Sequence, residues 1–578
     1  MLNKPSFIAF AVLLITFLSV NIYIKAETEV DDKQKLKYNQ DIFNTITYDE
    51  LVTISEGNAL APELQVQVDY VLNNSVVDNT ISKDSSVKNN NKVLGDFIRV
   101  ASWNIARGIH LDKIIKIFNE PEEMARLIEE QNPKKANIVK TQLGILKHAD
   151  IITLSEVDAG MPRTEYKVIV EEFAKSIGFN YAYGIEFLEV DPARLGLEEY
   201  RWSEEADLFP EGIDIDKDKY RGLHGNAILS RFPLKNVRII RLPKYYDWYT
   251  EERIKVGNLE SMRRKTASKL FGEKVLREIR YGSRIALVAD AEVPGLDTPV
   301  TIVAAHLENR TLPVYRKKQM KFLLKNIEDK QNPVVIGGDF NTALHDAAPI
   351  DAKNARKSRL NRFLSKLKIY NIPYKMIIVP ATTLPSTARK RLDPSVKSIP
   401  IVSVNPERKL FNLLKSFEFK DDTHFDFRST PGKFVGRPGN LANSNERKLK
   451  GFVETYEFQR PLYVGRFKLD WLFVKGYCKK AVDKECTYKM APHFGSTLVD
   501  LNYQYNEIFA DHAPVTVDLP LEDPGLLSKP EVKELKTIIK EKKKKKDPEA
   551  VQRLKEKKLQ EKNQQKLEKQ NKKNSEKQ

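Results

Sequence analysis

The stretch V-V-I-G-G-D-F-N, from Val334 to Asn341, sets the interpretation of the rest of the chain. It begins as an apolar run of β type and breaks at two glycines, which let the backbone turn sharply and approach a ligand closely. Asp339 and Asn341 lie two residues apart, so continued strand geometry places both side chains on one side of the sheet. A carboxylate beside an amide suits a hard cation or a phosphoryl oxygen, although a lone G-D-x-N also fits a strand that ends in a polar turn.

Other apolar runs of β type also deliver polar side chains at the point where each run ends. Each such residue alone has an ordinary structural explanation, but ligands in layered α/β proteins gather at strand ends of this kind. Acids, amides and histidines without cysteine suit Mg²⁺ or Mn²⁺ better than zinc. The residues in this pattern are Asn104, Glu156, His306, Asp339 with Asn341, Asp470, and Asp511 with His512.

The composition allows a large folded core and adds a strongly basic tail. The chain has 578 residues, 41% hydrophobic, and a formal net charge of +17, which is enough for one large domain or two ordinary ones. About half of the excess charge falls in the Lys/Glu/Gln-rich segment 531–578, which has no aromatic residue and cannot fold alone. Its run Lys542–Lys546 fits either a solubilising tail or a non-specific anchor for an anionic polymer or membrane surface.

The N-terminus is typical of an export signal. Lys4 precedes the almost unbroken apolar run Phe7–Val20, which is shorter than a comfortable membrane span. Residues 24–26 match a cleavage site poorly, so a cleaved signal peptide and an uncleaved anchor both stay open. We expect an exported protein that is periplasmic, secreted or anchored by its N-terminus. In an oxidising compartment Cys478 and Cys486 can close one small loop or stay reduced.

The texture of the sequence divides the chain into four parts. Residues 1–26 form the signal peptide or anchor, and residues 27–95 form a polar N-terminal extension in which Leu64–Val68 alternates like a strand. The main domain spans 96–522 and contains a proline-rich, poorly patterned insertion at 343–461. Residues 523–578 form the basic tail, which is disordered or helical.

Seven short segments together resemble the endonuclease/exonuclease/phosphatase superfamily, with its deoxyribonuclease I-like fold. They occur in the family's order within residues 97–520, and leave out the extension, the insertion and the tail. The resemblance implies an α/β (α+β) fold, a four-layer sandwich of two mixed β-sheets flanked by helices. The segments are S-W-N at 102–104, L-S-E at 154–156, H-G-N-A-I-L-S-R at 224–231, A-H-L at 305–307, G-G-D-F-N at 337–341, L-D-W at 469–471 and A-D-H-A-P-V at 510–515.

The resemblance also implies hydrolysis of a phosphoester by a metal-activated water, with Mg²⁺ or Mn²⁺ as cofactor. By position, Glu156 resembles the main metal ligand, with Asn104 beside it and Asp511 nearby. Asp470 resembles the acid that supports the histidine pair or the metal, and Asn226 takes a supporting place. Such an ion neutralises charge on the anionic substrate before attack.

The same resemblance implies the catalytic roles. Asp339 orients or deprotonates the attacking water, and Asn341 donates to the phosphate. His306 contacts the phosphate or the leaving group. His512, oriented by Asp511, binds the phosphate and stabilises the pentacovalent state; an Asp–His pair holds the imidazole in one tautomer. Arg316 and Gln319, on the helix expected at about 314–328, and Arg107 and His110 are weaker candidates, the first two being expected mainly at the surface.

Departures from the family patterns narrow the function. Ala106 stands where abasic-site endonucleases carry an acid, and G-R-F-K-L-D-W replaces the P-x-W-C-D-R of the inositol-phosphatase branch. We therefore expect an exported phosphodiesterase whose substrate is nucleic acid or a phospholipid head group. The basic runs at 353–368 and 389–409 suit nucleic acid, whereas an N-terminal anchor favours lipid. A catalytically silent binding or scaffold protein on the same fold is the alternative, and no protein partner is predicted.

Overall fold

The computed structural model describes most of the expected domain. Several predictions lie outside the described residues: the export segment 1–26, the two cysteines, most of the insertion with the basic run 353–368 and most of the run 389–409, and the tail 523–578. Within the described ranges, no helix has both the length and the apolar character to cross a membrane. The ranges are 42–190 (except 93, 132 and 134), 215–253, 279–342, 407–425, 455–460, 463–475, 494–504 and 509–522.

The first sheet runs in the order β1-β5-β6-β4-β3-β16-β15, with β2 added to β3 and β8 added to β5. Strands β3 and β4 are parallel, whereas β4 and β6 are antiparallel, so the sheet is mixed. Its strands are β1 (Ser75–Asp78), β2 (Asn89–Asn91), β3 (Gly95–Arg107), β4 (Ile151–Ala159), β5 (Asn180–Glu189), β6 (Leu223–Ser230), β8 (Arg280–Gly282), β15 (Phe494–Thr497) and β16 (Val515–Pro520).

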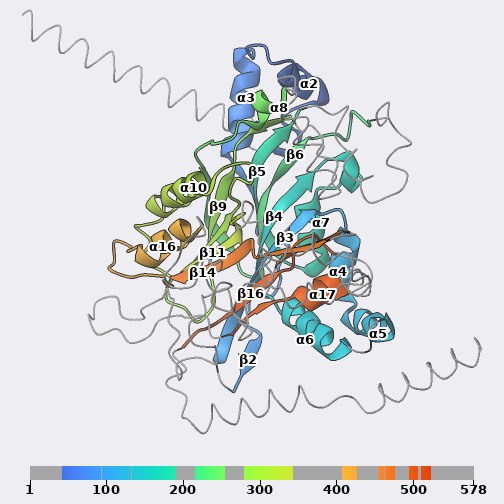
Figure 1. The fold of residues 1–578 in the computed structure, drawn as a ribbon, viewed down its shortest axis with the longest axis vertical. Coiled ribbons are helices and arrows are strands. Elements are labelled where there is room, and N and C mark those ends of the chain that lie inside the picture. The colour runs from blue at the N-terminus through green and yellow to red at the C-terminus, as the bar shows by residue number, and fades with distance from the viewer. Residues whose placement is uncertain are drawn as a thin grey trace, which may run out of the picture.

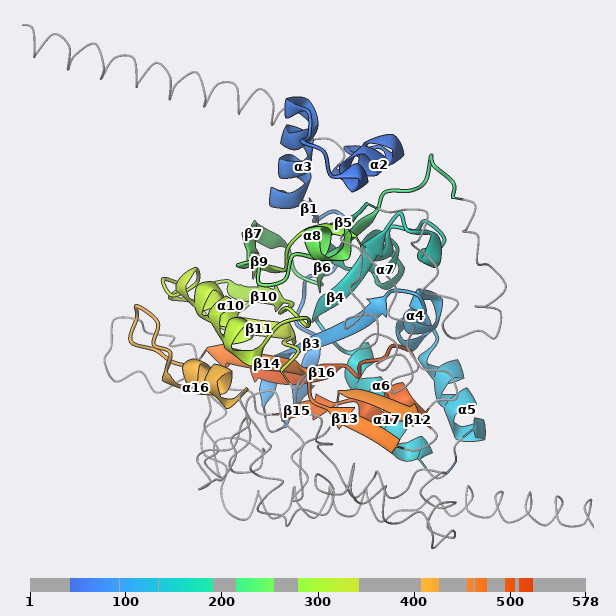
Figure 2. The same cartoon turned by 45° about the horizontal axis from the view of Figure 1, so that its top comes forward.

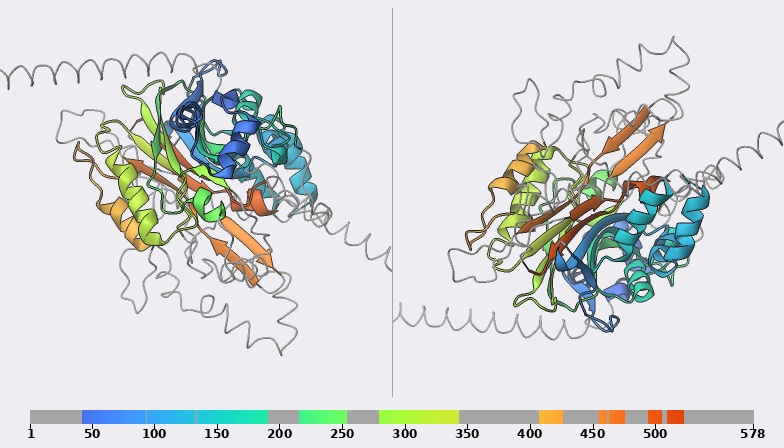
Figure 3. Two further views of the ribbon diagram at one scale, coloured as in Figure 1. Left: turned by 90° about the horizontal axis from the view of Figure 1, so that it is seen from above. Right: turned by 90° about the horizontal axis from the view of Figure 1, so that it is seen from below.

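The second sheet runs in the order β14-β11-β10-β9-β7. Here β10 and β11 are parallel and β11 and β14 antiparallel. Its strands are β7 (Leu234–Arg241), β9 (Ile285–Ala291), β10 (Val300–Ala305), β11 (Val334–Asp339) and β14 (Asp470–Lys475). A separate hairpin, β12 (Tyr456–Arg460) and β13 (Tyr463–Phe467), extends away from the layers (Figure 3).

Helices cover the outer face of each sheet and complete four layers (Figure 1). On one side α10 and α16 pack over the second sheet, and on the other α4, α6 and α7 lie over the first. The predicted four-layer sandwich of two mixed sheets is therefore confirmed. The helices are α4 (Leu111–Asn119), α5 (Pro121–Gln131), α6 (Ala136–Lys147), α7 (Ile169–Ile177), α8 (Trp248–Arg253), α10 (Pro313–Lys325), α16 (Arg408–Ser416) and α17 (Val499–Gln504), with 3-10 turns η1 (Ile42–Asn44) and η2 (Pro162–Thr164).

The two sheets meet through aliphatic side chains, which explains the apolar runs of the sequence. Side chains from both sheets form one buried cluster and are inaccessible to solvent. They include Val100 and Ile151 from the first sheet and Leu287, Val335 and Leu472 from the second. Strands that are covered on both faces read as continuous apolar runs, because neither face meets water.

Both glycines of the opening stretch are required by close approaches. A Cβ on Gly337 would lie 2.7 Å from the Thr153 hydroxyl of the facing sheet. Gly338 has φ +149°, and a Cβ there would lie 1.8 Å from the carbonyl oxygen of Ala305 on β10. Only glycine fits such contacts, so the pair lets β11 sit tightly against both neighbours and fixes where Asp339 emerges.

The N-terminal extension is built into the first sheet, and one prediction about it is wrong. Leu64–Val68, expected as a strand, lies in α3 (Pro62–Asn73), which follows α2 (Tyr48–Glu56); Figure 2 shows both helices above the sheet. Five alternating residues were too short a window, because burial of Leu64, Val68, Val71 and Leu72 follows the helical period. After the helices, β1 pairs with β5 and β2 with β3.

This packing predicts that the extension contributes to stability. Leu51 of α2 is fully buried, so Leu51→Ala should lower the free energy of unfolding by about 2–5 kcal/mol, as large-to-small core changes do. Denaturant titration of the full chain measures this loss. Val66→Ala, at a side chain that is 38% exposed, is the control and should change it by about 0.5 kcal/mol or less. Equal stability of the two variants would show that the extension is only loosely attached.

Candidate active site

Two β-bulges aim the first group of site residues. The register of β3 against β4 shifts between Asn104 and Arg107, and that of β4 against β6 shifts between Leu154 and Val157. At these points Arg107 has φ +67° and Glu156 has φ +54°. Bulges and left-handed non-glycine residues are costly and recur where a side chain must be redirected.

Glu156 lies at the bulge within β4 and is half-buried. Burial raises the pKa of its carboxyl, but the charges of Arg107, His306 and His224 outweigh burial and hold the pKa well below its ordinary value. Glu156 is thus ionised across the neutral range and lies within electrostatic reach of His306. Arg107, a weak candidate from the sequence, is the strongest of these cationic neighbours.

The second sheet supplies the opposite wall. In the register of β11 with β14, Asp339 faces Asp470 directly. Asn341 has φ +49°, and its backbone N–H donates to Oδ1 of Asp339 at 2.8 Å. Its side-chain Nδ2 donates to the carbonyl of Leu307 at 2.9 Å. Asn341 therefore fixes the loop after β10, and the predicted donation to phosphate would use the second N–H of the same amide.

Three of the predicted residues converge on one oxygen, Oδ2 of Asp339. Nδ2 of Asn104 lies 3.3 Å from it, Nε2 of His306 lies 3.8 Å from it, and Nε2 of His512 lies 3.9 Å from it. All four side chains are nearly inaccessible. Residues from both sheets and from positions 104 to 512 thus meet around one carboxylate.

Asp470, and not Asp511, orients His512. Nδ1 of His512 lies 2.7 Å from Oδ2 of Asp470, whereas Asp511 is half-buried beside the imidazole and acts on it through charge. The expected partner was wrong because Asp470 comes from β14, whose register the local sequence does not reveal. Burial lowers the pKa of His512, but Asp470, Asp511 and Asp339 outweigh burial and raise the pKa well above its ordinary value.

Asp339 shows the opposite balance. Burial and the neighbouring charge of Asp470 raise the pKa of its carboxyl, although His512 and His306 act against them. A carboxylate with a raised pKa is a stronger proton acceptor when ionised. The geometry therefore places this carboxylate between two imidazoles.

Sequence reasoning missed Glu186 and Arg284, which support His306. Nη1 of Arg284 lies 2.9 Å from Oε2 of Glu186 and 2.8 Å from Nδ1 of His306. Asn226, predicted as a supporting residue, donates Nδ2 to Oε1 of Glu186 at 3.1 Å and does not contact Asp339. Burial raises the pKa of Glu186, but His306 and Arg284 outweigh it and lower the pKa to about 2. The sequence signal that could have identified Glu186 was an acidic residue inside the otherwise apolar run of β5.

The expectation that Arg316 and Gln319 lie at the surface is wrong, since both are buried on α10. Arg316 forms an ion pair with Glu407 and donates to the carbonyl of Thr311 at 2.8 Å. Oε1 of Gln319 accepts the backbone N–H of Glu308 at 3.0 Å. They hold the loop that carries His306, whose course only the fold reveals.

The donor set fits a hard divalent cation. Ligand atoms of Asp339, Asp470 and His512 lie within 4.8 Å of one another. Among the residues that the structure describes, none hydrogen-bonds to the buried Oδ1 of Asp470, so this oxygen can still accept a ligand. Carboxylate and amide oxygens are the donors that suit Mg²⁺ or Mn²⁺. His512, held by Asp470 and with a raised pKa, is a neighbouring positive charge and not a ligand.

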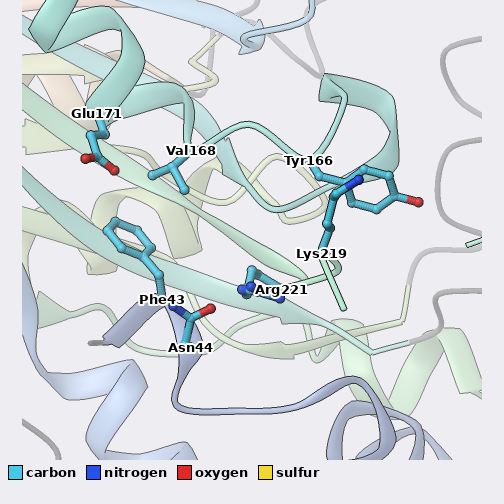
Figure 4. A pocket seen from close by; sticks show the side chains of 7 residues that line it. All are labelled: Phe43, Asn44, Tyr166, Val168, Glu171, Lys219 and Arg221. Carbon is cyan, nitrogen blue, oxygen red and sulfur yellow. The ribbon is translucent and has the colours of Figure 1, made fainter. Parts of the chain in front are cut away.

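A pocket of about 250 Å³ lies elsewhere, between the N-terminal segment and the domain (Figure 4). Its lining shares no residue with the Asp339 cluster. Its charged side chains already have partners, since Lys219 lies 2.8 Å from Asp216, Glu171 forms an ion pair with Lys175, and Arg221 donates to the carbonyl of Asp218 at 2.6 Å. We therefore place the candidate active site at Asp339 and not at this pocket.

Comparison with solved structures finds similar chains at low sequence identity. The chain is similar to an endonuclease/exonuclease/phosphatase from Beutenbergia cavernae, at 14% identity and TM-score 0.31, over 75% of this chain and 72% of that chain. It is similar to the human Nocturnin catalytic domain, at 14% identity and TM-score 0.31, over 73% and 94%. It is also similar to a 3'-5' exonuclease from Neisseria meningitidis, at 14% identity and TM-score 0.31, over 73% and 99%.

Comparison with curated protein sequences gives no match. The model of the Endonuclease/Exonuclease/phosphatase family matches residues 101–476, which is most of the main domain and contains Asn104, Glu156, Asp339 and Asp470. The match confirms the resemblance and contains six of the seven segments, all but A-D-H-A-P-V at 510–515. The chain belongs to the endonuclease/exonuclease/phosphatase family.

Proposed function

We propose that this protein is an exported phosphodiesterase that depends on Mg²⁺ or Mn²⁺ and acts on nucleic acid or a phospholipid head group. Family membership supports phosphoester hydrolysis in general. The observation that carries the proposal is the placement of Oδ2 of Asp339 within 3.9 Å of Nε2 of both His306 and His512. A base flanked by two imidazoles serves attack on an anionic ester, because it can take a proton while they face the developing charge.

Each residue has a role in this proposal. Asp339 accepts the proton of the attacking water. His512, held by Asp470, stabilises negative charge on the phosphate, and His306 faces the leaving-group side. A divalent cation held by Glu156 and Asn104, with Asp511 and Asp470 close by, would neutralise phosphate charge and lower the pKa of water.

The decisive experiment is a panel of phosphoesters assayed with Mg²⁺ and again after EDTA. It includes plasmid DNA, RNA, sphingomyelin vesicles, inositol phosphates and p-nitrophenyl phosphate esters. We expect hydrolysis of at least one diester, its loss in EDTA, and its recovery when Mg²⁺ or Mn²⁺ is restored. Hydrolysis that persists in EDTA would contradict the requirement for a divalent cation. Absence of hydrolysis on every ester would favour a binding or scaffold role on the same fold.

Salt and membrane dependence separate the two substrate classes. Hydrolysis of nucleic acid through phosphate contacts should fall steeply as salt rises. Hydrolysis of lipid should instead require a bilayer surface. Export is tested separately, by finding the full-length protein in the extracytoplasmic fraction; retention in the cytoplasm would refute that part.

A further inference from the structure

Helix α10, on the outer side of the second sheet (Figure 1), presents apolar side chains to solvent. Leu312, just before the helix, is 57% exposed, Val314 is 44% exposed and Phe322 is 41% exposed. These three are half of the large apolar side chains that are exposed within the described ranges. Single exposed apolar residues are ordinary, but a group of them indicates an interaction surface.

Lysines share this face of the helix. Val314, Lys318, Lys321 and Lys325 follow one another at intervals of three and four residues, which place them on one side of α10, and the lysines are exposed. The helix contains no acidic residue, and within the described ranges its one ion pair is the buried one of Arg316. The face is therefore both apolar and positively charged. We name it the α10 patch, which consists of Leu312, Val314, Lys318, Lys321, Phe322 and Lys325.

A stacked pair of tyrosines borders the first turn of α10. The ring centroids of Tyr245 and Tyr315 lie 4.7 Å apart, and both side chains are half-buried. Nζ of Lys318 lies 5.1 Å from the centre of the Tyr315 ring and 5.7 Å from that of Tyr245. Tyrosine combines an apolar ring with a polar hydroxyl, so it suits the boundary between hydrocarbon and water.

This combination fits an anionic bilayer better than a nucleic acid. Nucleic acids are bound by cations and by aromatic rings that stack on the bases, but Leu312 and Val314, the two most exposed apolar side chains, are aliphatic and cannot stack. A bilayer takes aliphatic side chains at the level of its acyl chains, and anionic head groups attract lysines. From this complementarity we propose that the α10 patch docks the protein on a bilayer that contains anionic phospholipid.

Docking on this surface holds the candidate active site close to the head groups. Leu312 follows His306 by six positions, so their Cα atoms lie at most about 21 Å apart. The loop between them is braced from α10, because Arg316 donates to the carbonyl of Thr311 at 2.8 Å. The docking therefore favours a phospholipid head group as the substrate. That consequence rests on the proposed function, whereas the docking itself does not.

Two variants of the full-length protein test the apolar and the charged part of the patch. Leu312 is the N-cap of α10 and makes no capping hydrogen bond. Because serine is a preferred N-cap residue, Leu312→Ser removes an apolar anchor without weakening the helix, and Lys318→Gln/Lys321→Gln keeps a similar helix propensity. On vesicles of phosphatidylcholine and phosphatidylserine, sedimentation should show about 10-fold weaker binding for Leu312→Ser. The double variant should bind about 25-fold more weakly, since each lysine near such a surface contributes about fivefold.

Matched changes on α6, which covers the other sheet, are the controls. Lys140→Gln/Lys147→Gln also removes two lysines from one helix, and Ile138→Ser removes an apolar side chain that is 40% exposed. Both should bind vesicles as the wild type does. Weakening equal to that of the patch variants would show that binding follows total charge and surface hydrophobicity, and would overturn the proposal.

Acetylation of lysines in the full-length protein, measured by mass spectrometry, locates the contact even if the N-terminal segment or the tail also binds lipid. Lys318 and Lys321 should lose reactivity on vesicles, while Lys140 keeps it. Unchanged reactivity of the patch lysines overturns the proposal, and protection by single-stranded DNA but not by vesicles would overturn it in favour of nucleic acid. This measurement needs no hydrolysis, so if no ester is hydrolysed the proposed function fails while the docking is still decided.

Discussion

Phosphoester hydrolysis by the Glu156→Gln variant should be about 10³-fold slower than by the wild type. The carboxyl pKa of Glu156 is held well below its ordinary value by Arg107, His306 and His224, which outweigh burial. Gln keeps the size of the side chain but removes this charge. A cation at the site supplies several kcal/mol of transition-state stabilisation. Each 1.36 kcal/mol of this stabilisation corresponds to about a tenfold change in rate, so loss of the cation should slow hydrolysis by about 10³-fold. Initial rates on the best ester of the panel, over a Mg²⁺ titration, measure the effect.

Glu165→Gln is the matched control for this experiment. Glu165 has the same φ of +54° as Glu156, but its side chain is 79% exposed and lies outside the Asp339 cluster. The activity of the Glu165→Gln variant should equal that of the wild type. Should Glu156→Gln also retain full turnover, the metal-hydrolase mechanism would have to be abandoned.

Asp470→Asn should lower kcat by about 10²–10⁴-fold, the usual worth of a positioned acid–base group. Asp470 is the strongest of the carboxylates that raise the pKa of His512 against burial. Without it the pKa of His512 should fall, and the activity that needs a charged imidazole should be lost at lower pH than in the wild type. The pH–rate profile of both proteins measures this. Asp500→Asn, which removes a partner of Lys135, should leave the profile in place.

The same pair has a stability consequence with a definite sign. A histidine whose pKa is raised by folding stabilises the fold fully below its unfolded pKa, near 6.5, and the benefit is lost as pH rises through the folded pKa. Stability of the wild type should therefore decline above neutral pH by an amount that Asp470→Asn removes. Denaturant midpoints measured from pH 6 to pH 10, a range of about four units, test this decline. Parallel curves of midpoint against pH for the wild type and Asp470→Asn would argue against a charged His512.

The four-layer architecture was predicted from the resemblance of the seven segments to a known family, while the apolar runs indicated only where single buried strands lie. The glycine pair at 337–338 and the polar residues that follow β10 and β11 indicated where a site would lie, and the structure gathers His306 and His512 around Asp339 as expected. Their catalytic roles stay predictions.

The partnerships within the site were beyond sequence reasoning. Asp470 was predicted in a supporting role. Its contact with His512 depends on the register of β14 against β11, in which Asp470 pairs with Asp339 although the two are 131 positions apart in the sequence. Glu186 and Arg284 are 98 residues apart and gain meaning only when β5 and β9 face each other. Helix α3 was misread because five residues cannot separate a period of 2 from one of 3.6.

The pairing of β1 with β5 also determines how the chain can be shortened. Val76 and Val77 of β1 lie opposite Tyr183 and Ala182 of β5, and β8 covers only the far end of that strand. A fragment that starts after residue 78 would leave the near end of β5 as a bare edge, with unpaired amides that invite strands from other molecules. Strand β1 thus protects the protein against self-association as well as stabilising the fold.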